Sequence, residues 1–144
     1  MKKKTSIIYS VLCMLLVLSV GYSISNNVKA NDLKERIKYN EKVSFDLYYR
    51  ELEGVHKAIN LSIEGKQDQA LLNMFVRKMY VAQEGYIGSL YMNEEELKLK
   101  KLDELRMKID AVINIDLTRL TGEELASTNK QLEELLDELK EMGE

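Results

Sequence analysis

The chain has 144 residues with 24 acidic and 21 basic side chains, and it contains neither proline nor tryptophan. All the acidic residues lie beyond Ala30 together with 17 of the basic ones, so residues 31–144 carry a net charge of −7. This balance disfavours nucleic acid and anionic lipid as partners of that part. A composition dominated by Leu, Ile, Lys and Glu favours an all-α fold over a sheet protein.

The first thirty residues form a segment of different character. Three lysines, Lys2 to Lys4, precede 18 uncharged residues at 7–24. A membrane span needs about 20 apolar residues, with a range of roughly 17–25, and lysines before such a run stay on the cytoplasmic side. We therefore predict a membrane anchor within residues 1–30 that crosses the cell membrane once, with the N-terminus inside and residues 31–144 outside. The residues that we single out in this segment are Ile7, Leu15, Leu16 and Ile24.

The same segment offers an alternative, a cleaved signal peptide. Val28-Lys29-Ala30 places small or short residues at the positions that a signal peptidase inspects, so cleavage near Ala30 would give a secreted protein. The one cysteine, Cys13, lies inside the segment, where it serves as a small hydrophobic side chain. Residues 31–144 therefore contain no disulfide and depend on packing for their stability.

The first predicted helix beyond this segment runs from Asp32 to about Ile63. No breaker separates it from the apolar segment, so the two can form one continuous helix. Gly65 is expected to end it, and Asp68 to cap the next helix. Its apolar side chains recur every three or four residues, which places them on one stripe: Phe45, Tyr48, Leu52, Val55 and Ile59.

The second predicted helix runs from about Gln69 to Tyr91. Near its end, four residues are small: Ala82, Gly85, Gly88 and Ser89. We expect a neighbouring helix to approach closely there; the alternative is that the glycines only weaken the helix, by about 1 kcal/mol each relative to alanine. The apolar stripe of this helix contains Leu72, Phe75, Met79, Ala82, Tyr86 and Leu90.

Two capping boxes mark the remaining helix starts, Asn93 with Glu96 and Thr121 with Glu124. The third helix is predicted to extend to about Arg119. Its apolar positions are Leu99, Leu102, Leu105, Ile109, Val112, Ile113, Leu117 and Leu120. The fourth helix carries Leu125, Thr128, Leu132, Leu135, Leu139 and Met142 at alternating steps of three and four, the spacing of a coiled-coil seam, and ends at Gly143.

Four amphipathic helices with short connections predict an antiparallel, up-and-down helical bundle over residues 31–144. Alternatively, the first two helices form a long hairpin beside the last two. In either arrangement the stripes require one another, because a lone helix of this kind is unstable in water.

Candidate reactive groups are few. Glu53 and His56 have the Glu-x-x-His spacing of carboxylate-bridged metal centres, but such centres need the unit twice and the chain has one histidine. The acidic runs at 94–96 and 133–138 suit a helix start and a solvated face. Neither a nucleophile signature nor a phosphate loop is present in the sequence. We predict that the protein is not an enzyme and uses no cofactor and no metal.

The tyrosines are the candidate interaction residues, since tyrosine serves both cores and interfaces. Tyr48 and Tyr86 fall on the apolar stripes and are predicted to be core residues. Tyr49, Tyr80 and Tyr91 fall off or at the edge of the stripes, and we predict that they face a partner.

The layout of a short basic end, an apolar segment and long helices resembles the N-terminal helical region of the YpeB family of bacterial spore germination proteins. The similar residues are Tyr39-Asn40, the stretch Leu52 to Ile59 with His56, and Leu120-Thr121 leading through Glu124 to Asn129, Leu132 and Leu135. The resemblance implies a germination-related role beside another envelope protein. The family's C-terminal domains have no counterpart in this sequence.

We interpret the chain as a non-catalytic, membrane-tethered extracytoplasmic helical bundle, an interaction or accessory module for another bacterial envelope protein. The expected partners are the membrane, through the N-terminal segment, and a protein or a second copy of the chain. The alternative is a helical sensor-type domain that binds a small ligand or cation, suggested by the polar Thr128 on a leucine seam.

Overall fold

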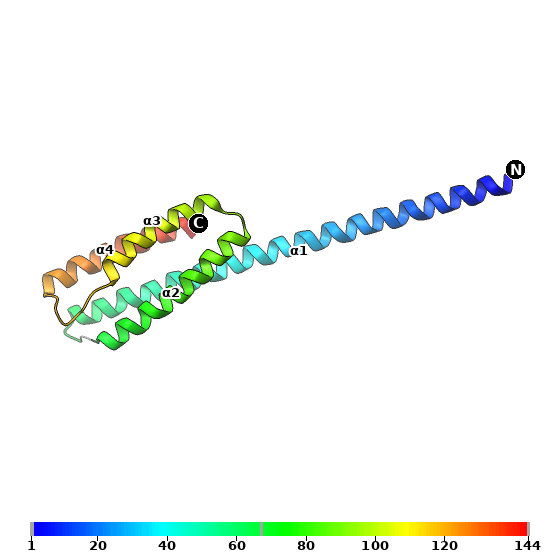
Figure 1. Ribbon diagram of the computed structural model, residues 1–144. Coiled ribbons are helices and arrows are strands. Elements are labelled where there is room, and N and C mark those ends of the chain that lie inside the picture. The colour runs from blue at the N-terminus through cyan, green and yellow to red at the C-terminus, as the bar shows by residue number, and fades with distance from the viewer. Residues whose placement is uncertain (1, 67, 144) are drawn as a thin grey trace. The chain divides into compact units, whose positions relative to one another are not determined.

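Four helices make up the protein in the computed structural model, which describes the backbone of residues 2–66 and 68–143 and the side chains of residues 14–66 and 68–143. They are α1 (Lys2–Ile63), α2 (Gln69–Met92), α3 (Glu96–Ile113) and α4 (Gly122–Gly143) (Figure 1). The described residues contain no strand, so the predicted all-α class is confirmed. The chain divides into two units, residues 1–36 and residues 37–144, and each is described by itself.

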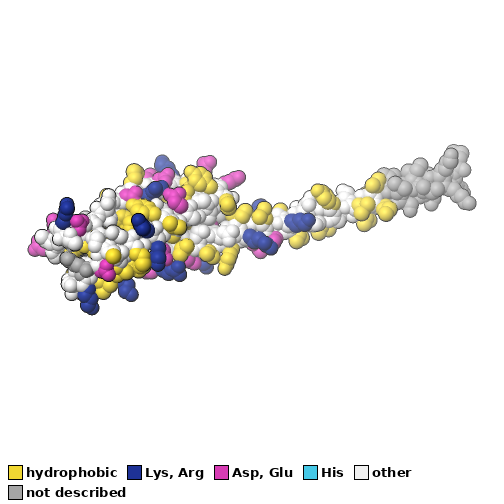
Figure 2. Space-filling model, turned by 60° about the horizontal axis from the view of Figure 1, so that its bottom comes forward, with side chains coloured by type: hydrophobic (Ala, Val, Ile, Leu, Met, Phe, Trp, Pro, Cys, Tyr) yellow, Lys and Arg dark blue, Asp and Glu magenta, His cyan; other side chains and the backbone are white. Residues whose placement is uncertain are grey.

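The described side chains of the first unit are exposed, as the apolar groups along this part of α1 show (Figure 2). Leu15, Leu16 and Ile24 each leave more than half of their surface uncovered, at 59%, 66% and 59%. The side chain of Ile7 lies outside the described residues. Within the described part of the chain, no helix has an apolar stretch of the length and hydropathy that crossing a membrane requires. The predicted anchor stays a prediction.

The second unit is a helical bundle whose core consists of the predicted stripes. The part of α1 from Ile37 onward, α2, α3 and α4 alternate in direction, and α3 packs against both α2 and α4 (Figure 1). The stripe positions that are buried are Tyr48, Leu52, Val55 and Ile59 of α1, Leu72, Met79, Ala82, Tyr86 and Leu90 of α2, Leu102, Leu105, Ile109 and Ile113 of α3, and Leu125, Leu132, Leu135 and Leu139 of α4. The periodicity therefore identified the buried face of every helix.

Three of the predicted helix signals are confirmed. Gly65 has a positive φ of 81°, which glycine adopts readily at the end of a helix. Asp68 accepts a hydrogen bond from the Leu71 amide at 2.9 Å and so caps α2. Between Thr121 and Glu124 the capping box forms in both directions, with N–H···O distances of 2.8 and 3.3 Å.

The predicted capping box of Asn93 and Glu96 is wrong. Asn93 is instead the C-cap residue of α2, and α3 begins at Glu96 without a side-chain hydrogen bond that caps it. Glu94 has a φ of 57°, and the Asn93 side-chain amide donates to the carboxylate of Glu41 on α1. A capping box needs the Asn93 side-chain oxygen as an acceptor at the start of α3, whereas Asn93 is the C-cap residue of α2 and the residue before α3 is Glu95.

The predicted end of the third helix near Arg119 is also wrong, because α3 ends at Ile113. Asp116 accepts hydrogen bonds from the backbone and the hydroxyl of Thr118, a local turn that competes with helix. The Leu117 amide donates to Gln69 Oε1 at 2.8 Å, and its side chain is fully buried. Leu117 is thus a core residue that lies in a loop. Its burial was predicted correctly, but its place in a helix was not.

The predicted close approach of a neighbouring helix is wrong at Gly85 and Gly88, since a Cβ at either position would meet no atom within 4 Å. Ala82 and Ser89, the other two small residues, are buried. Close packing occurs instead at Gly54 on α1, where an added Cβ would clash with the ring of Phe75 on α2. The absence of a side chain at Gly54 is what lets Phe75 lie across α1.

We predict opposite effects of alanine at these two glycines. Gly54→Ala lowers the free energy of unfolding by about 1–3 kcal/mol, because the Phe75 ring has to move. Gly85→Ala raises it by up to about 1 kcal/mol, because alanine is the better helix former and has open space. Urea denaturation followed by circular dichroism measures both, and equal effects of the same sign would contradict the packing described.

Candidate functional site

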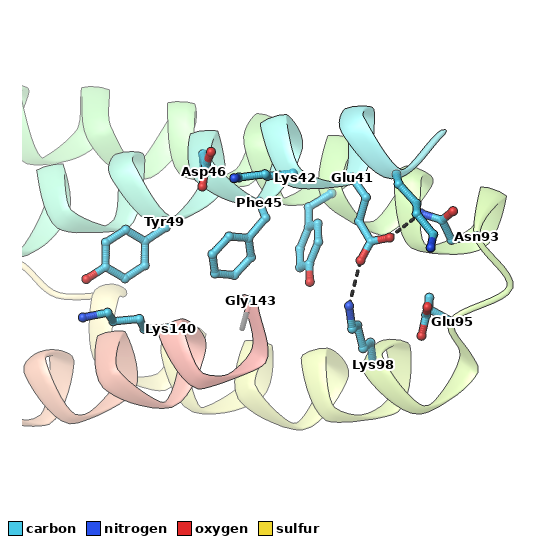
Figure 3. A pocket seen from close by; sticks show the side chains of 12 residues that line it. Glu41, Lys42, Phe45, Asp46, Tyr49, Asn93, Glu95, Lys98, Lys140 and Gly143 are labelled. Carbon is cyan, nitrogen blue, oxygen red and sulfur yellow. Dashed lines mark hydrogen bonds and ion pairs between the residues drawn. The ribbon is translucent and has the colours of Figure 1, made fainter. Parts of the chain in front are cut away.

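A pocket of about 580 Å³ lies in the second unit, and we call it the end pocket (Figure 3). All four helices and the turn between α2 and α3 contribute to it. Its lining residues are Lys38, Glu41, Lys42, Phe45, Asp46 and Tyr49 of α1, Tyr86 of α2, Asn93 and Glu95 of the turn, Lys98 of α3, and Lys140 and Gly143 of α4. Its volume falls in the range of about 300–1,000 Å³ that small-molecule sites occupy.

Three aromatic rings form the apolar part of the end pocket. Phe45 stacks on Tyr49 with ring centres 6.3 Å apart, and it meets Tyr86 edge to face at 5.4 Å. The spacing of Phe45 and Tyr49 on α1, four residues apart, brings their side chains to the same face of the helix. Gly143 lies directly against the Phe45 ring, where a Cβ would clash. The last turn of α4 thus closes one side of the pocket.

A carboxylate holds the opposite side of the end pocket together. Glu41 accepts a hydrogen bond from Lys98 Nζ at 2.9 Å and another from the Asn93 side-chain amide (Figure 3). The Glu41 side chain is 13% exposed and that of Lys98 37%. Charge-assisted bonds of this kind are about twice as strong as neutral ones. They connect α1 to the turn before α3 and to α3 itself.

The other charged side chains of the end pocket remain available to a ligand. Among the described residues, no carboxylate lies within 4.0 Å of the ammonium group of Lys38, Lys42 or Lys140. In the same part of the chain, no cationic group lies within 4.0 Å of the carboxylate of Asp46 or Glu95. The lining carries four lysines and three carboxylates, a slight positive excess in a part of the chain whose net charge is −7. The pocket can therefore accept an apolar group on its rings and an anionic group at its lysines.

The structure places the three predicted partner-facing tyrosines in different surroundings. Tyr49 lines the end pocket. Tyr80 is half-buried, and its hydroxyl donates to Asp110 Oδ1 at 2.8 Å, so it ties α2 to α3. Tyr91 is 69% exposed at the end of α2 and is not part of the pocket lining. Whether any of the three meets a partner stays a prediction.

The charged residues of the pocket had no distinctive signal in the sequence. Glu41, Lys98 and Lys140 lie off the apolar stripes, and such positions ordinarily face water. They come together only because α1, α3 and α4 pack side by side. The aromatic residues of the pocket did have a signal, because Phe45 and Tyr86 fall on predicted apolar stripes and Tyr49 lies at the edge of one.

The candidate metal-ligand pair does not form a site. Glu53 is exposed, and His56 is half-buried with its Nε2 lacking a hydrogen-bond partner in the described part of the chain. No group of three or more His, Cys, Asp or Glu side chains within the described residues is arranged to hold a metal ion. The acidic run of α4 is exposed, and Glu138 pairs with Lys108 of α3 at 2.6 Å.

Comparison with known proteins does not assign the chain to a family. No family model, no curated protein and no solved structure matches the chain. The resemblance to the YpeB family therefore stays a prediction from the layout of the sequence.

Alkaline titration probes the tyrosines of the core and the end pocket. Burial raises the pKa of Tyr48, Tyr80 and Tyr86 from near 10 to about 12. Between pH 10 and 12 the unfolded chain loses tyrosine protons that the folded protein keeps, so the free energy of unfolding is unaffected by these groups below pH 10 and falls above it. Denaturation in urea at a series of pH values measures this fall.

The matched control is Tyr86→Phe, which removes one of the three groups. The fall above pH 10 should become shallower in this variant. A fall unchanged from that of the natural protein would contradict the burial of Tyr86.

Proposed function

We propose that the protein is a non-catalytic, membrane-tethered module on the outer side of a bacterial cell membrane, and that its end pocket binds a segment of another envelope protein. The observation that carries the proposal is the end pocket itself, with three aromatic rings beside lysines that are not engaged in described ion pairs. Aromatic side chains are enriched where proteins meet partners, because they combine a large apolar area with a polar tip.

The lining of the pocket indicates the chemistry of the partner segment. The rings of Phe45 and Tyr49 suit an apolar side chain, and Lys42 and Lys140 suit a carboxylate next to it. The net charge of residues 31–144 is negative, so at long range this part of the chain repels a strongly acidic partner. A segment with one apolar anchor and an adjacent acidic residue satisfies the pocket without bringing a large negative charge to the surface.

A binding role is more consistent with this lining than a catalytic one. His56, the one histidine of the chain, is not among the residues of the end pocket. The lysines of the lining suit the binding of an anionic group.

The second candidate function is a sensor that binds a small molecule. The volume of the end pocket favours it, and the ligand would be an anionic molecule with an apolar part. Four lysines disfavour a bare cation. Thr128, which suggested this alternative, is half-buried on α4 and does not line the pocket. Thermal-shift measurements with aromatic and aliphatic carboxylates separate a small ligand from a protein segment.

A photo-crosslinking amino acid in place of Tyr49 tests the partner proposal in the native cell. We expect it to capture one envelope protein, with the attachment mapped by mass spectrometry to an apolar residue beside an acidic one. Lys140→Glu should reduce this capture by about tenfold or more, because it repels the acidic residue. The matched control on the same helix is Lys130→Glu, whose side chain is 78% exposed and outside the pocket.

Two outcomes would contradict the binding role of the pocket. The first is equal capture with Lys140→Glu and Lys130→Glu. The second is a crosslink that maps to many unrelated proteins.

Membrane attachment has its own test. We expect the full chain to remain in carbonate-washed membranes, and the double change Leu15→Asp with Leu16→Asp to release it, since a charged residue at the centre of a span costs about 2.5–3.5 kcal/mol. Leu33→Asp is the control, because Leu33 lies outside the predicted segment. Recovery of a soluble protein whose mass begins after Ala30 would establish the cleaved alternative instead.

A further inference from the structure

The hydroxyl of Tyr86 is a polar group of the end pocket that has no partner. The side chain of Tyr86 lines the pocket and is 1% exposed. Among the described residues, no hydrogen bond joins its hydroxyl to another group, whereas the hydroxyl of the neighbouring Tyr48 accepts one from Gln83. A hydroxyl that is removed from water without a partner costs free energy. A ligand with a polar atom that reaches this hydroxyl removes that cost.

Two carboxylates lie near the Tyr86 hydroxyl. Burial, and after it the charges of Glu41 and Glu95, raise the pKa of Tyr86 to about 12, so the group is a neutral hydroxyl near pH 7. Glu41 is paired with Lys98, and Lys38, one turn before Glu41 on α1, is exposed. Glu95 is half-buried, and among the described residues no cationic group lies within 4.0 Å of its carboxylate. An unpaired carboxylate beside an unpaired hydroxyl suits a cationic group that donates hydrogen bonds.

The two ends of the end pocket therefore differ in charge (Figure 3). Lys140 lies beside Tyr49 at one end, and Glu95 lies at the other. At the first end, Lys42 and Lys140 outnumber Asp46 and leave one positive charge. A ligand with a carboxylate at the first end and a cation at the second matches both.

The spacing along α1 indicates the shape of such a ligand. Glu41, Phe45 and Tyr49 follow one another every four residues, which is about 6 Å along the helix for each step. In an extended peptide, alternate side chains point to the same side at intervals of about 6.6 Å. An extended segment along α1 can thus place three alternate side chains near Glu41, on Phe45 and beside Tyr49.

We propose that the segment bound in the end pocket carries a lysine or arginine whose side chain donates hydrogen bonds to the Tyr86 hydroxyl and the Glu95 carboxylate. The apolar residue of the segment lies two positions away on the Phe45 ring, and its acidic residue lies two positions further, at Lys140. The inference rests on the function proposed above and adds to it the pattern that the pocket recognises, which is basic, apolar and acidic at alternate positions in either chain direction.

The photo-crosslinking amino acid in place of Tyr49, in the full chain and in the native cell, also tests this inference. Tyr86→Phe should reduce capture by about tenfold, because it removes the hydroxyl and keeps the ring, and Glu95→Gln should do the same by removing the charge. The matched controls are Tyr91→Phe and Glu94→Gln, at exposed positions outside the pocket lining, and they should leave capture unchanged. Circular dichroism melts establish that every variant is folded.

The captured segment gives a second measurement, which a purely structural role of Tyr86 would not affect. Mass spectrometry should find a lysine or arginine two positions from the apolar residue, on the side away from the acidic one. Methionine in place of this basic residue should lower capture. Tyr86→Phe should then lower it no further, because both changes remove the same hydrogen bond.

Three outcomes overturn the inference. They are equal capture with Tyr86→Phe and Tyr91→Phe, a captured segment without a basic residue at that position, and a Tyr86→Phe effect that persists in full after the change to methionine. Each of them leaves the proposed function intact, provided that Lys140→Glu lowers capture. If the natural pocket captures no protein at all, the inference and the proposed function are both wrong.

Discussion

The bundle depends on the mutual burial of four apolar stripes. A single amphipathic helix leaves its stripe in water and is marginal by itself, and a chain with one cysteine cannot be reinforced by an internal disulfide. Tyr48 lies at the centre of this packing, fully buried, with its hydroxyl accepting a hydrogen bond from Gln83 at 2.9 Å. It stacks with Tyr86 at 6.3 Å, and Tyr86 in turn meets Phe45. The rings that line the end pocket are therefore the outer end of an aromatic row that begins in the core, and the packing that folds the bundle also fixes the shape of the site.

The helices and their buried faces could be predicted from the sequence because both follow from local spacing. Helix ends were harder, as the two capping boxes demonstrate. Thr121 with Glu124 and Asn93 with Glu96 carry the same signal, yet only the first forms. Asn93 instead ends α2 as its C-cap, and its side-chain amide donates to Glu41, 52 residues away along the chain. Leu117 teaches the same lesson in another form, because its apolar phase correctly predicted burial but not helix. Leu117 lies in a loop, where its amide donates to the side chain of Gln69, 48 residues earlier in the chain.

The candidate sites were largely beyond the reach of sequence reasoning. A lysine or glutamate on the polar face of a helix has the same local signature whether it faces water or a neighbouring helix, so Lys98 and Lys140 could not be distinguished from the other charged residues. The glycines show the converse. Gly85 and Gly88 on α2 predicted the close approach of a neighbouring helix, but an added Cβ would meet nothing at either position. The glycine that close packing requires is Gly54 on α1, which no pattern in the sequence marked. What decides each case is which side chain arrives from another helix, here the ring of Phe75.

The loop between α3 and α4 and the turn between α1 and α2 differ in how firmly they are attached to the core. The loop after α3 is fastened to the bundle by Leu117 and Gln69, so added residues there would pull a core side chain out of place. The turn around Gly65, by contrast, is exposed and polar from Glu64 to Lys66, and it contributes nothing to the core. An epitope tag or a fluorescent reporter inserted at this turn leaves the end pocket accessible, because the residues that line the pocket lie at the other end of the bundle.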